Sequence, residues 1–519
     1  MLPRLHARIV AAVLALGVVV VLLSAAPVLA RADRPAGPAG RLPGDPAARV
    51  ALAAARGALA GDGREVTLAL RDLALRRGGL VGREREEADR ILARPTDGPL
   101  DPDGYGLLAD PQRTCTVVCL HWVERGVDAV PTADADADGL PDHVEQALAV
   151  LTRVHRTYVR AGYRAPKADG ALGGDRRPDV YLVDIGDQAV YGYCTTDELL
   201  RPGGPYDAWA YCVLDNDYDP AQFPQGTPLG NLRVTAAHEY FHAVQYGYDA
   251  AEDPWLLEAT ATWAEDELYD AVDDNLQYLR RSPLSQPAVP VDAGGFTSYG
   301  GWVLFRHLTE RFRTAGGGLP TFVRDVWRQA DSRRGAPDRW SVQAIGRVLQ
   351  QRGTTLRGAF ARFAAANRHP RATYDEGRAN DYPHAPLADR AVLGAGRTTG
   401  WGSMRLDHLT SGTVRLSPRA GLRGAWRVRL QLDLPPPAAG AAAVVTTKVR
   451  GRPATTRLVR TDRRGRAALR APLGAATWVE VTLANGSGRY RCWQATDLAC
   501  MGTPVDDGAV FRWRATATR

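Results

Sequence analysis

The sequence predicts an α+β domain followed by an all-β, sandwich-like domain. Three observations support this: strand-like runs between residues 114 and 214, a mostly helical region over 231–380, and short alternating runs separated by turn residues beyond about 390. At roughly 100 to 200 residues per domain, 519 residues suggest about three units. We expect a signal peptide at 1–32, a linker and helical segment at 33–100, the α+β domain at 101–388 and the β-sandwich at 389–519.

The N-terminus is typical of a secretory signal peptide. Basic residues from Arg4 to Arg8 precede an apolar run over 9–23, and small residues over 27–30 supply a cleavage region. An uncleaved anchor is the alternative, because the apolar run is only slightly short for a spanning helix. No later segment approaches membrane length, so we expect a secreted protein with no stable membrane span after signal cleavage.

The segment after the signal peptide has two parts. Residues 33–46 are rich in Pro and Gly and indicate a linker, whereas 47–95 carry helical apolar periodicity that ends at the breaker cluster 95–102. The helical part is either a propeptide that covers the active site until it is removed or a permanent flank. It contains no Cys, so a propeptide here could not inhibit through a thiolate on a metal.

The predicted α+β domain begins with strands and ends in helices. The runs 114–123, 180–185 and 209–214 are typical of strands, and a helix of about 18 residues begins near Asp142. In the β-domain, Asn485-Gly486-Ser487 matches a glycosylation sequon. Asn-Gly between two strands more simply predicts a tight hairpin turn.

The six cysteines fall into three couples that are close in sequence. Export favours disulfides, and the couples fit no zinc-finger spacing. The expected disulfides are Cys115 with Cys119, Cys194 with Cys212, and Cys492 with Cys500. The net charge is +7, but the arginines are spread along the whole chain, so we expect no nucleic-acid partner.

The stretch 231–246 is an uninterrupted helical pattern that Gly247 is expected to close. His238 and His242 are four residues apart, which places both imidazoles on one face, about 6 Å apart along the axis. Glu239 lies about 100° round from His238, where a carboxylate can act as a base without being a ligand. The spacing predicts a zinc site with two ligands and a general base.

A catalytic zinc normally takes three protein ligands and leaves one position open. Asp253 and Pro254 are a helix-starting pair, and Glu258 in the following helix is the best candidate for the third ligand. Glu265 or Asp266 could take its place. The metzincin pattern is excluded, because Gln245 and Tyr248 stand where it requires Gly and His.

HEYFHAVQ followed by WLLEATATWAED resembles the gluzincin peptidases of the thermolysin-like superfamily. Together with DADADGLPDHVE, DVYLVDIG and RYRCWQ, these motifs are similar to a poorly characterised bacterial family of predicted secreted metalloproteases, from about Val66 to the C-terminus. The resemblance implies a zincin-like domain that hydrolyses peptide or protein substrates, with His238, His242 and Glu258 as zinc ligands and Glu239 as base.

Two departures from the gluzincin pattern stand out. The 16 positions from His242 to Glu258 are few, and Thr262 stands where thermolysin-like enzymes place an orienting Asp. The donor for the developing oxyanion is also missing. Tyr299 is similar in placement to the downstream Tyr of several gluzincins, although it could instead pack with Phe296 and Trp302.

A second motif predicts a structural calcium loop. Oxygen ligands stand at the EF-hand positions 1, 3, 5, 7, 9 and 12, and Gly139 permits the sharp bend at position 6. These ligands are Asp134, Asp136, Asp138, Leu140 through its carbonyl, Asp142 and Glu145. A further acidic group, Asp215, Asp217 and Asp219, lacks the Gly and the closing Glu, and we interpret it as a surface turn.

Two other functions remain open from sequence alone. The chain could be an exported binding or adhesion protein whose zinc site is vestigial, but a structural zinc has no use for Glu239. It could also hydrolyse a non-peptide amide or ester, which nothing in the sequence excludes.

Overall fold

The computed structural model describes residues 44–61, 65–97, 104–106, 109–201, 203–492, 500 and 502–519. The predicted signal peptide 1–32 and all but the end of the linker lie outside the described residues. Within the described ranges, no helix is both long enough and apolar enough to cross a membrane. A mixture of helices and sheets with a sheet-rich C-terminal region, as expected, is confirmed.

A five-stranded sheet lies at the centre of the N-terminal half, in the order β1-β2-β3-β5-β4. The strands are β1 Gln112–Cys115, β2 Cys119–Trp122, β3 Asp179–Val183, β4 Gly192–Thr195 and β5 Tyr211–Asp215. Strands β2, β3 and β5 run parallel, and β1 and β4 pair antiparallel at the two edges.

The single strand predicted over 114–123 is wrong. Residues 116–118 turn the chain back, so this stretch forms the β1–β2 hairpin, with Cys115 opposite Cys119 in the register. The apolar run could not reveal the turn, because Val118 is buried inside it and keeps the pattern continuous. Strand β4 was not predicted.

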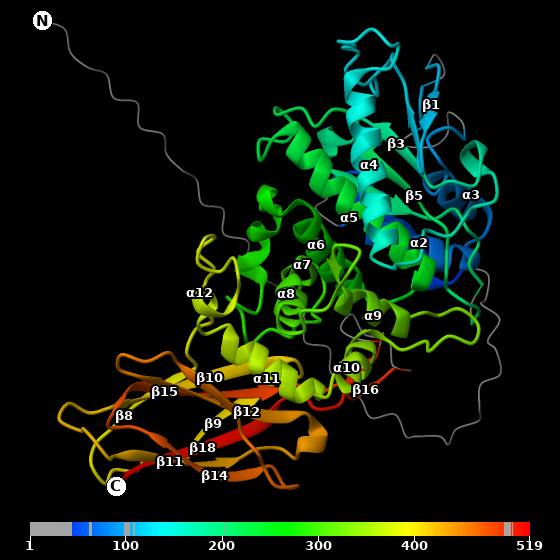
Figure 1. The fold of residues 1–519 in the computed structure, drawn as a ribbon. Helices are drawn as coiled ribbons and strands as arrows, with labels where there is room; N and C mark the ends of the chain where they lie inside the picture. Colours follow the sequence, from blue (N-terminus) through cyan, green and yellow to red (C-terminus); the bar gives the residue numbers. More distant parts are fainter. Residues whose placement is uncertain are drawn as a thin grey trace, which may run out of the picture. The chain divides into compact units, whose positions relative to one another are not determined.

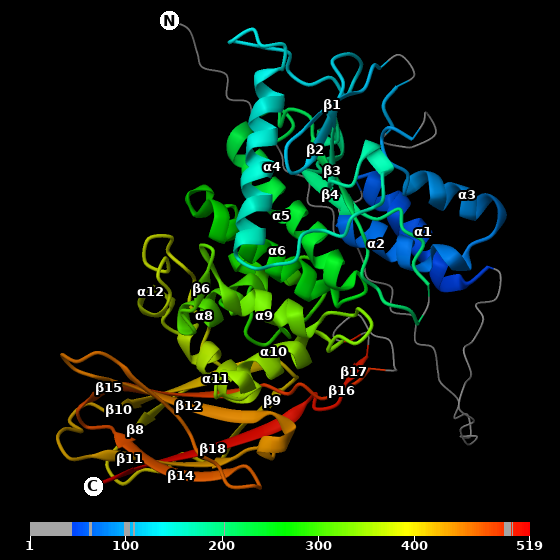
Figure 2. The ribbon, with the colours of Figure 1, turned by 45° about the vertical axis from the view of Figure 1, so that its right-hand side comes forward.

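Helices cover both faces of this sheet (Figures 1 and 2). Val180 and Leu182 of β3 point into the core shared with α4 Asp142–Arg160 and α5 Pro228–Asp249. Tyr181 and Val183 point into a second core, formed with the three N-terminal helices. These are α1 Pro46–Leu59, α2 Val66–Arg76 and α3 Gly82–Ile91.

Helix α5 is longer than its sequence pattern indicated. It continues through Gly247 to Asp249, so the prediction that Gly247 closes the helix is wrong. Burial on all sides outweighs the roughly 1 kcal/mol cost of a helical Gly.

Helix α6, Pro254–Tyr269, follows after a short loop and packs beside α5. Pro254 begins the helix as expected, but the Asp253 side chain does not cap it. The Asp253 carboxylate instead accepts hydrogen bonds from Ser341 Oγ and the Cys500 backbone N–H.

The rest of the helical region supports α6 and leads to the β-rich region. Its helices are α7 Thr297–Gly300, α8 Trp302–Arg311, α9 Thr321–Gln329, α10 Ser341–Gln351, α11 Leu356–Ala366 and α12 Pro370–Thr373. A small hairpin pairs β6 Ala315–Gly316 with β7 Leu319–Pro320 between α8 and α9.

The C-terminal region contains two sheets whose apolar sides share one core (Figure 1). One has the order β13-β12-β15-β10-β8 and the other β14-β11-β18-β9. Their strands are β8 Asp389–Leu393, β9 Gly402–Leu406, β10 Thr410–Pro418, β11 Arg427–Asp433, β12 Ala441–Val449, β13 Thr455–Leu458, β14 Arg466–Pro472, β15 Ala476–Asn485 and β18 Ala509–Thr518. Strands β16 Tyr490–Arg491 and β17 Thr503–Pro504 form a separate pair.

The tight hairpin predicted at Asn485-Gly486 is wrong. Strand β15 ends at Asn485 but pairs with β10 and β12, not with the next strand. Asn485 is fully buried, and its amide donates to the carbonyls of Leu406 and Asp506. Its sequon is therefore not accessible in the folded chain.

Candidate metal centre

Two neighbouring helices bring together the residues that the HExxH pattern singled out. His238, Glu239 and His242 lie on α5, and Glu258 lies on α6. His242 and Glu258 are fully buried, while His238 and Glu239 keep 7% and 6% of their surface exposed. The site is thus closed at one end and open at the other.

The two histidines and Glu258 converge on one point. His238 Nε2 lies 3.2 Å from Glu258 Oε2, and His242 Nε2 lies 3.6 Å from Glu258 Oε1. Two ligands at about 2.1 Å from a tetrahedral zinc are themselves about 3.4 Å apart. The observed separations therefore match those of a zinc ligand set.

Two buried atoms of this group have no hydrogen-bond partner: His242 Nε2 and Glu258 Oε1. A buried polar atom without a partner is costly, so a cation between them would satisfy both. Burial alone would raise the pKa of Glu258, but the charges and hydrogen bonds of His242 and His238 outweigh it and hold that pKa below its usual value.

In both histidines, Nδ1 contacts a neighbouring side chain. His238 Nδ1 lies 3.2 Å from Glu265 Oε2, and His242 Nδ1 lies 2.7 Å from Gln245 Oε1. Gln245 is itself fixed, because its amide donates to the Leu257 carbonyl. Such contacts set the tautomer of metal-binding histidines and leave Nε2 free for the metal.

The structure separates the three acids considered as the third ligand. Glu258 joins the histidines, whereas Glu265 contacts the far side of His238. Asp266 accepts from Asn275 and pairs with Arg306, away from the site.

Sequence reasoning missed the orienting role of Gln245, which had served only to exclude the metzincin pattern. It also missed that Glu265 contacts His238 Nδ1, because the gluzincin pattern places the orienting acid at the position that Thr262 occupies here.

The N-terminal helix α2 contributes to the site. Thr67 is fully buried, and its hydroxyl donates a 3.0 Å hydrogen bond to Glu239 Oε2 and accepts from the Cys194 backbone N–H. Burial raises the pKa of the Glu239 carboxyl, against the charges of His238 and His242.

Glu65 caps α2 by accepting from the Thr67 and Leu68 N–H groups. Burial, and then the charges of Glu258 and Glu239, raise its pKa well above the usual value. Neither Glu65 nor Thr67 carries a motif, so nothing in the sequence marked them.

A cavity of about 340 Å³ opens beside His238 and Glu239. Tyr299, on α7, lines it, and its ring stacks on His238 with centroids 5.8 Å apart. Tyr299 also stacks on Tyr278 at 4.8 Å. The structure thus brings the predicted oxyanion donor to the cavity wall next to a zinc-ligand candidate.

The predicted calcium loop brings three of its six ligands close together. Ligand atoms of Asp134, Asp136 and Asp138 all lie within 4.8 Å of one another. Asp142 Oδ1 accepts from the Ala135 N–H. Burial raises the pKa of Glu145, at the start of α4, and the charges of the four loop aspartates add to this.

Leu140 was expected to contribute only its carbonyl to the loop, and its N–H donates to Asp138 Oδ1. The other acidic group departs from its prediction at one residue. Asp215 is fully buried and accepts from the N–H groups of Asp217, Tyr218 and Ile185, whereas Asp219 is exposed, as a surface turn requires.

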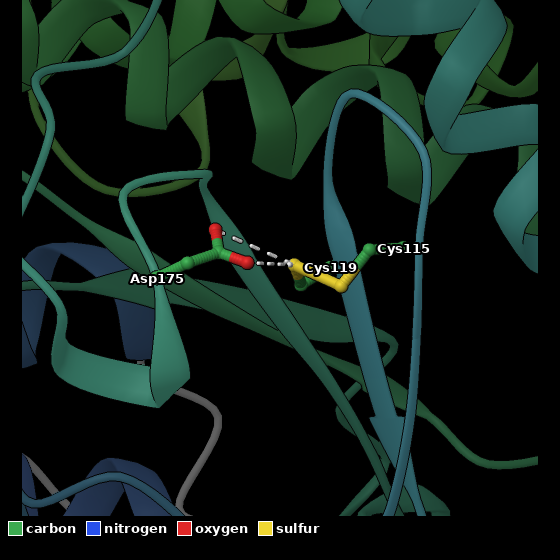
Figure 3. A group of neighbouring side chains, drawn as sticks. All are labelled: Cys115, Cys119 and Asp175. Atoms are coloured by element: carbon green, nitrogen blue, oxygen red, sulfur yellow. Dashed lines mark hydrogen bonds between the residues drawn. A yellow bond between two sulfur atoms is a disulfide. The ribbon is translucent and has the colours of Figure 1, made fainter.

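All three expected disulfides are present. Figure 3 shows Cys115 and Cys119 with Asp175, whose carboxylate oxygens lie 3.7 and 3.9 Å from Cys119 Sγ. Both sulfurs are bonded to each other, so these residues are not available as thiolate ligands. Arg113 and Arg177 pair with Asp175 and account for its charge.

No known family model and no curated protein matches the chain.

Proposed function

We propose that the chain is a secreted zinc metallopeptidase of the gluzincin type, with a zincin-like domain that hydrolyses peptide bonds. The observation that carries the proposal is the pair of buried, unpartnered atoms, His242 Nε2 and Glu258 Oε1, set beside His238 Nε2 at zinc-ligand separations. A zinc ion held there would polarise a carbonyl group and lower the pKa of a bound water to about 7.

Glu239 supplies the proton transfer. Its carboxylate lines the cavity, is not one of the three metal-facing side chains, and is held by Thr67. In this role it takes the proton of the attacking water and delivers it to the leaving amine. Tyr299, which lines the same cavity, is the proposed donor to the developing oxyanion.

The open cavity favours catalysis over a purely structural zinc. A structural zinc is enclosed by four protein ligands, whereas a catalytic zinc has three and faces open space. Here His238 lines the cavity while His242 and Glu258 are fully buried behind it. An adhesion function for the β-rich region would leave this arrangement unexplained.

The test compares wild type, Glu239→Ala and the exposed control Glu86→Gln on a denatured protein mixture, with zinc content measured for each. We expect wild type and Glu86→Gln to cleave and to bind one zinc. Glu239→Ala should bind zinc but lose at least about a hundredfold in rate. Equal cleavage by Glu239→Ala, or well-folded wild type that takes up no zinc, contradicts the proposal.

We also propose that the 134–145 loop binds calcium in a structural role. The support is the group of Asp134, Asp136 and Asp138, whose charges also raise the pKa of the nearby Glu145. Ca²⁺ should raise the melting temperature of wild type but not of Asp136→Asn, since bound ligands stabilise the folded state. A Ca²⁺ effect of equal size in both proteins contradicts this site.

A further inference from the structure

The cavity beside His238 is strongly acidic. Helices α2, α5 and α6 and the 274–299 segment line it, and they contribute four carboxylates. These are Glu65, Glu239, Glu265 and Asp274. No Lys or Arg stands among its described lining residues.

A bound zinc would use only one nearby carboxylate as a ligand, that of Glu258. The carboxyl groups of Glu65, Glu239, Glu265 and Asp274 still line the cavity, and burial raises the pKa of each. The cavity next to the metal therefore offers several carboxyl oxygens to a cationic group.

Glu265 is a second, independent indication. It is 4% exposed, and while Oε2 contacts His238 Nδ1, its Oε1 has no hydrogen-bond partner. It is a buried, unsatisfied acceptor in the lining of the cavity. A donor that reached this oxygen would satisfy it.

The opposite wall is aromatic. Tyr278 and Tyr299 stack at 4.8 Å, and Phe296 adjoins Tyr299 at 6.2 Å. Aromatic faces attract cations. One face of Phe296 is already occupied by the Arg281 guanidinium, which lies 4.9 Å from the ring centroid.

We propose that this cavity binds a cationic group of the substrate, an ammonium or guanidinium, next to the bond that is cleaved. The inference rests on the proposed function and names its substrate class: peptides with a basic side chain or a free N-terminal amine beside the scissile bond. Glu65, Glu265 and Asp274 supply carboxyl oxygens, and Tyr278 and Phe296 supply aromatic surface.

Binding without turnover gives the first test. Zinc-loaded Glu239→Ala is titrated with four matched peptides, which carry lysine or norleucine beside the scissile bond and a free or acetylated N-terminus. We expect at least tenfold tighter binding of a cationic form. Preference for lysine identifies a basic side chain as the ligand, and preference for the free amine identifies the N-terminus. Equal affinity for all four peptides overturns the inference.

Substitutions of the carboxyl residues that line the cavity test where the cationic group binds. Asp274→Asn and Glu65→Gln, each in the Glu239→Ala background, should reduce the discrimination several-fold, while Glu86→Gln on the exposed side of α3 should leave it intact. Discrimination that survives both cavity variants contradicts the assignment. Turnover separates the two proposals: wild type that cleaves neutral and cationic peptides equally well refutes this inference alone, and zinc-loaded wild type that cleaves none refutes the peptidase.

Discussion

The Thr67 hydroxyl donates a 3.0 Å hydrogen bond to Oε2 of Glu239, across 172 residues of sequence. The same oxygen of Thr67 accepts a hydrogen bond from the Cys194 N–H, and the hydroxyl donates its own proton to the Glu239 carboxylate. The N-terminal helices are thereby connected to the proposed general base.

Replacing Thr67 should impair catalysis without removing the metal. Thr67→Val keeps the shape but leaves Glu239 Oε2 without its donor, and we expect kcat to fall roughly tenfold, which corresponds to about 1.4 kcal/mol. Thr67→Ser retains the hydroxyl and should stay close to wild type. Steady-state kinetics and zinc content check both. Equal kcat for Thr67→Val and wild type contradicts a positioning role.

Arg94 connects the end of the 47–95 segment to the rest of the chain. Its side chain is 1% exposed and forms ion pairs with Asp169, Asp179 and Asp197 at 2.7 to 2.8 Å. Removing one partner of a buried ion pair costs about 3–5 kcal/mol. Arg94→Leu should therefore lower the free energy of unfolding by several kcal/mol, as measured by urea denaturation.

A chain that starts at residue 104 tests the whole segment. It loses Arg94 together with α1, α2 and α3, which cover one face of the central sheet. We expect it to be insoluble or unfolded, as a permanent flank requires. A soluble chain that is more active than the full protein would instead identify the segment as a propeptide.

The difference between what the sequence predicted and what it missed follows from distance along the chain. His238, Glu239 and His242 are set by one helix repeat, and Glu258 follows from a helix start four residues before it. Such local patterns are visible in any sequence. Contacts between Thr67 and Glu239 depend on how α2 packs against the sheet, which no local pattern encodes.

The wrong predictions at Asn485-Gly486 and Gly247 also arose because local patterns do not encode tertiary packing. The Asn485-Gly486 pair is common in tight hairpins, but β15 pairs with β10 and β12, so tertiary pairing overrides the local turn preference. Gly247 is likewise a common helix end, and the buried surroundings of α5 carry the helix past it.

Gln245 should control zinc affinity through His242. Its Oε1 lies 2.7 Å from His242 Nδ1, and its amide is anchored on the Leu257 carbonyl and Thr260 Oγ1. Loss of such an orienting partner typically weakens metal binding 10- to 100-fold. Gln245→Leu should show this in competition with a chromophoric chelator. Gln350→Leu, on the exposed side of α10, is the control and should bind zinc like wild type.

The junction between the helical and β-rich regions should be sensitive to pH through His408. This residue is 1% exposed, with Nε2 2.8 Å from Asp292 Oδ1 and Nδ1 2.6 Å from Asp507 Oδ1. Tyr490 donates its hydroxyl to the same Asp292 carboxylate. Burial lowers the pKa of His408, but the hydrogen bonds and charges of the two aspartates outweigh it and raise that pKa above its usual value.

Because the pKa of His408 is raised on folding, the folded chain holds its proton more tightly than the unfolded chain. The resulting stabilisation is complete below the unfolded pKa of about 6.5 and is lost as the pH rises through the folded value. We therefore expect His408→Gln to cost more free energy of unfolding at pH 6 than at pH 9, measured by urea denaturation. The exposed His384→Gln should show little change at either pH. A cost for His408→Gln that is equal at both pH values would mean that the imidazole acts as a neutral packing group and that the two aspartates do not hold it charged.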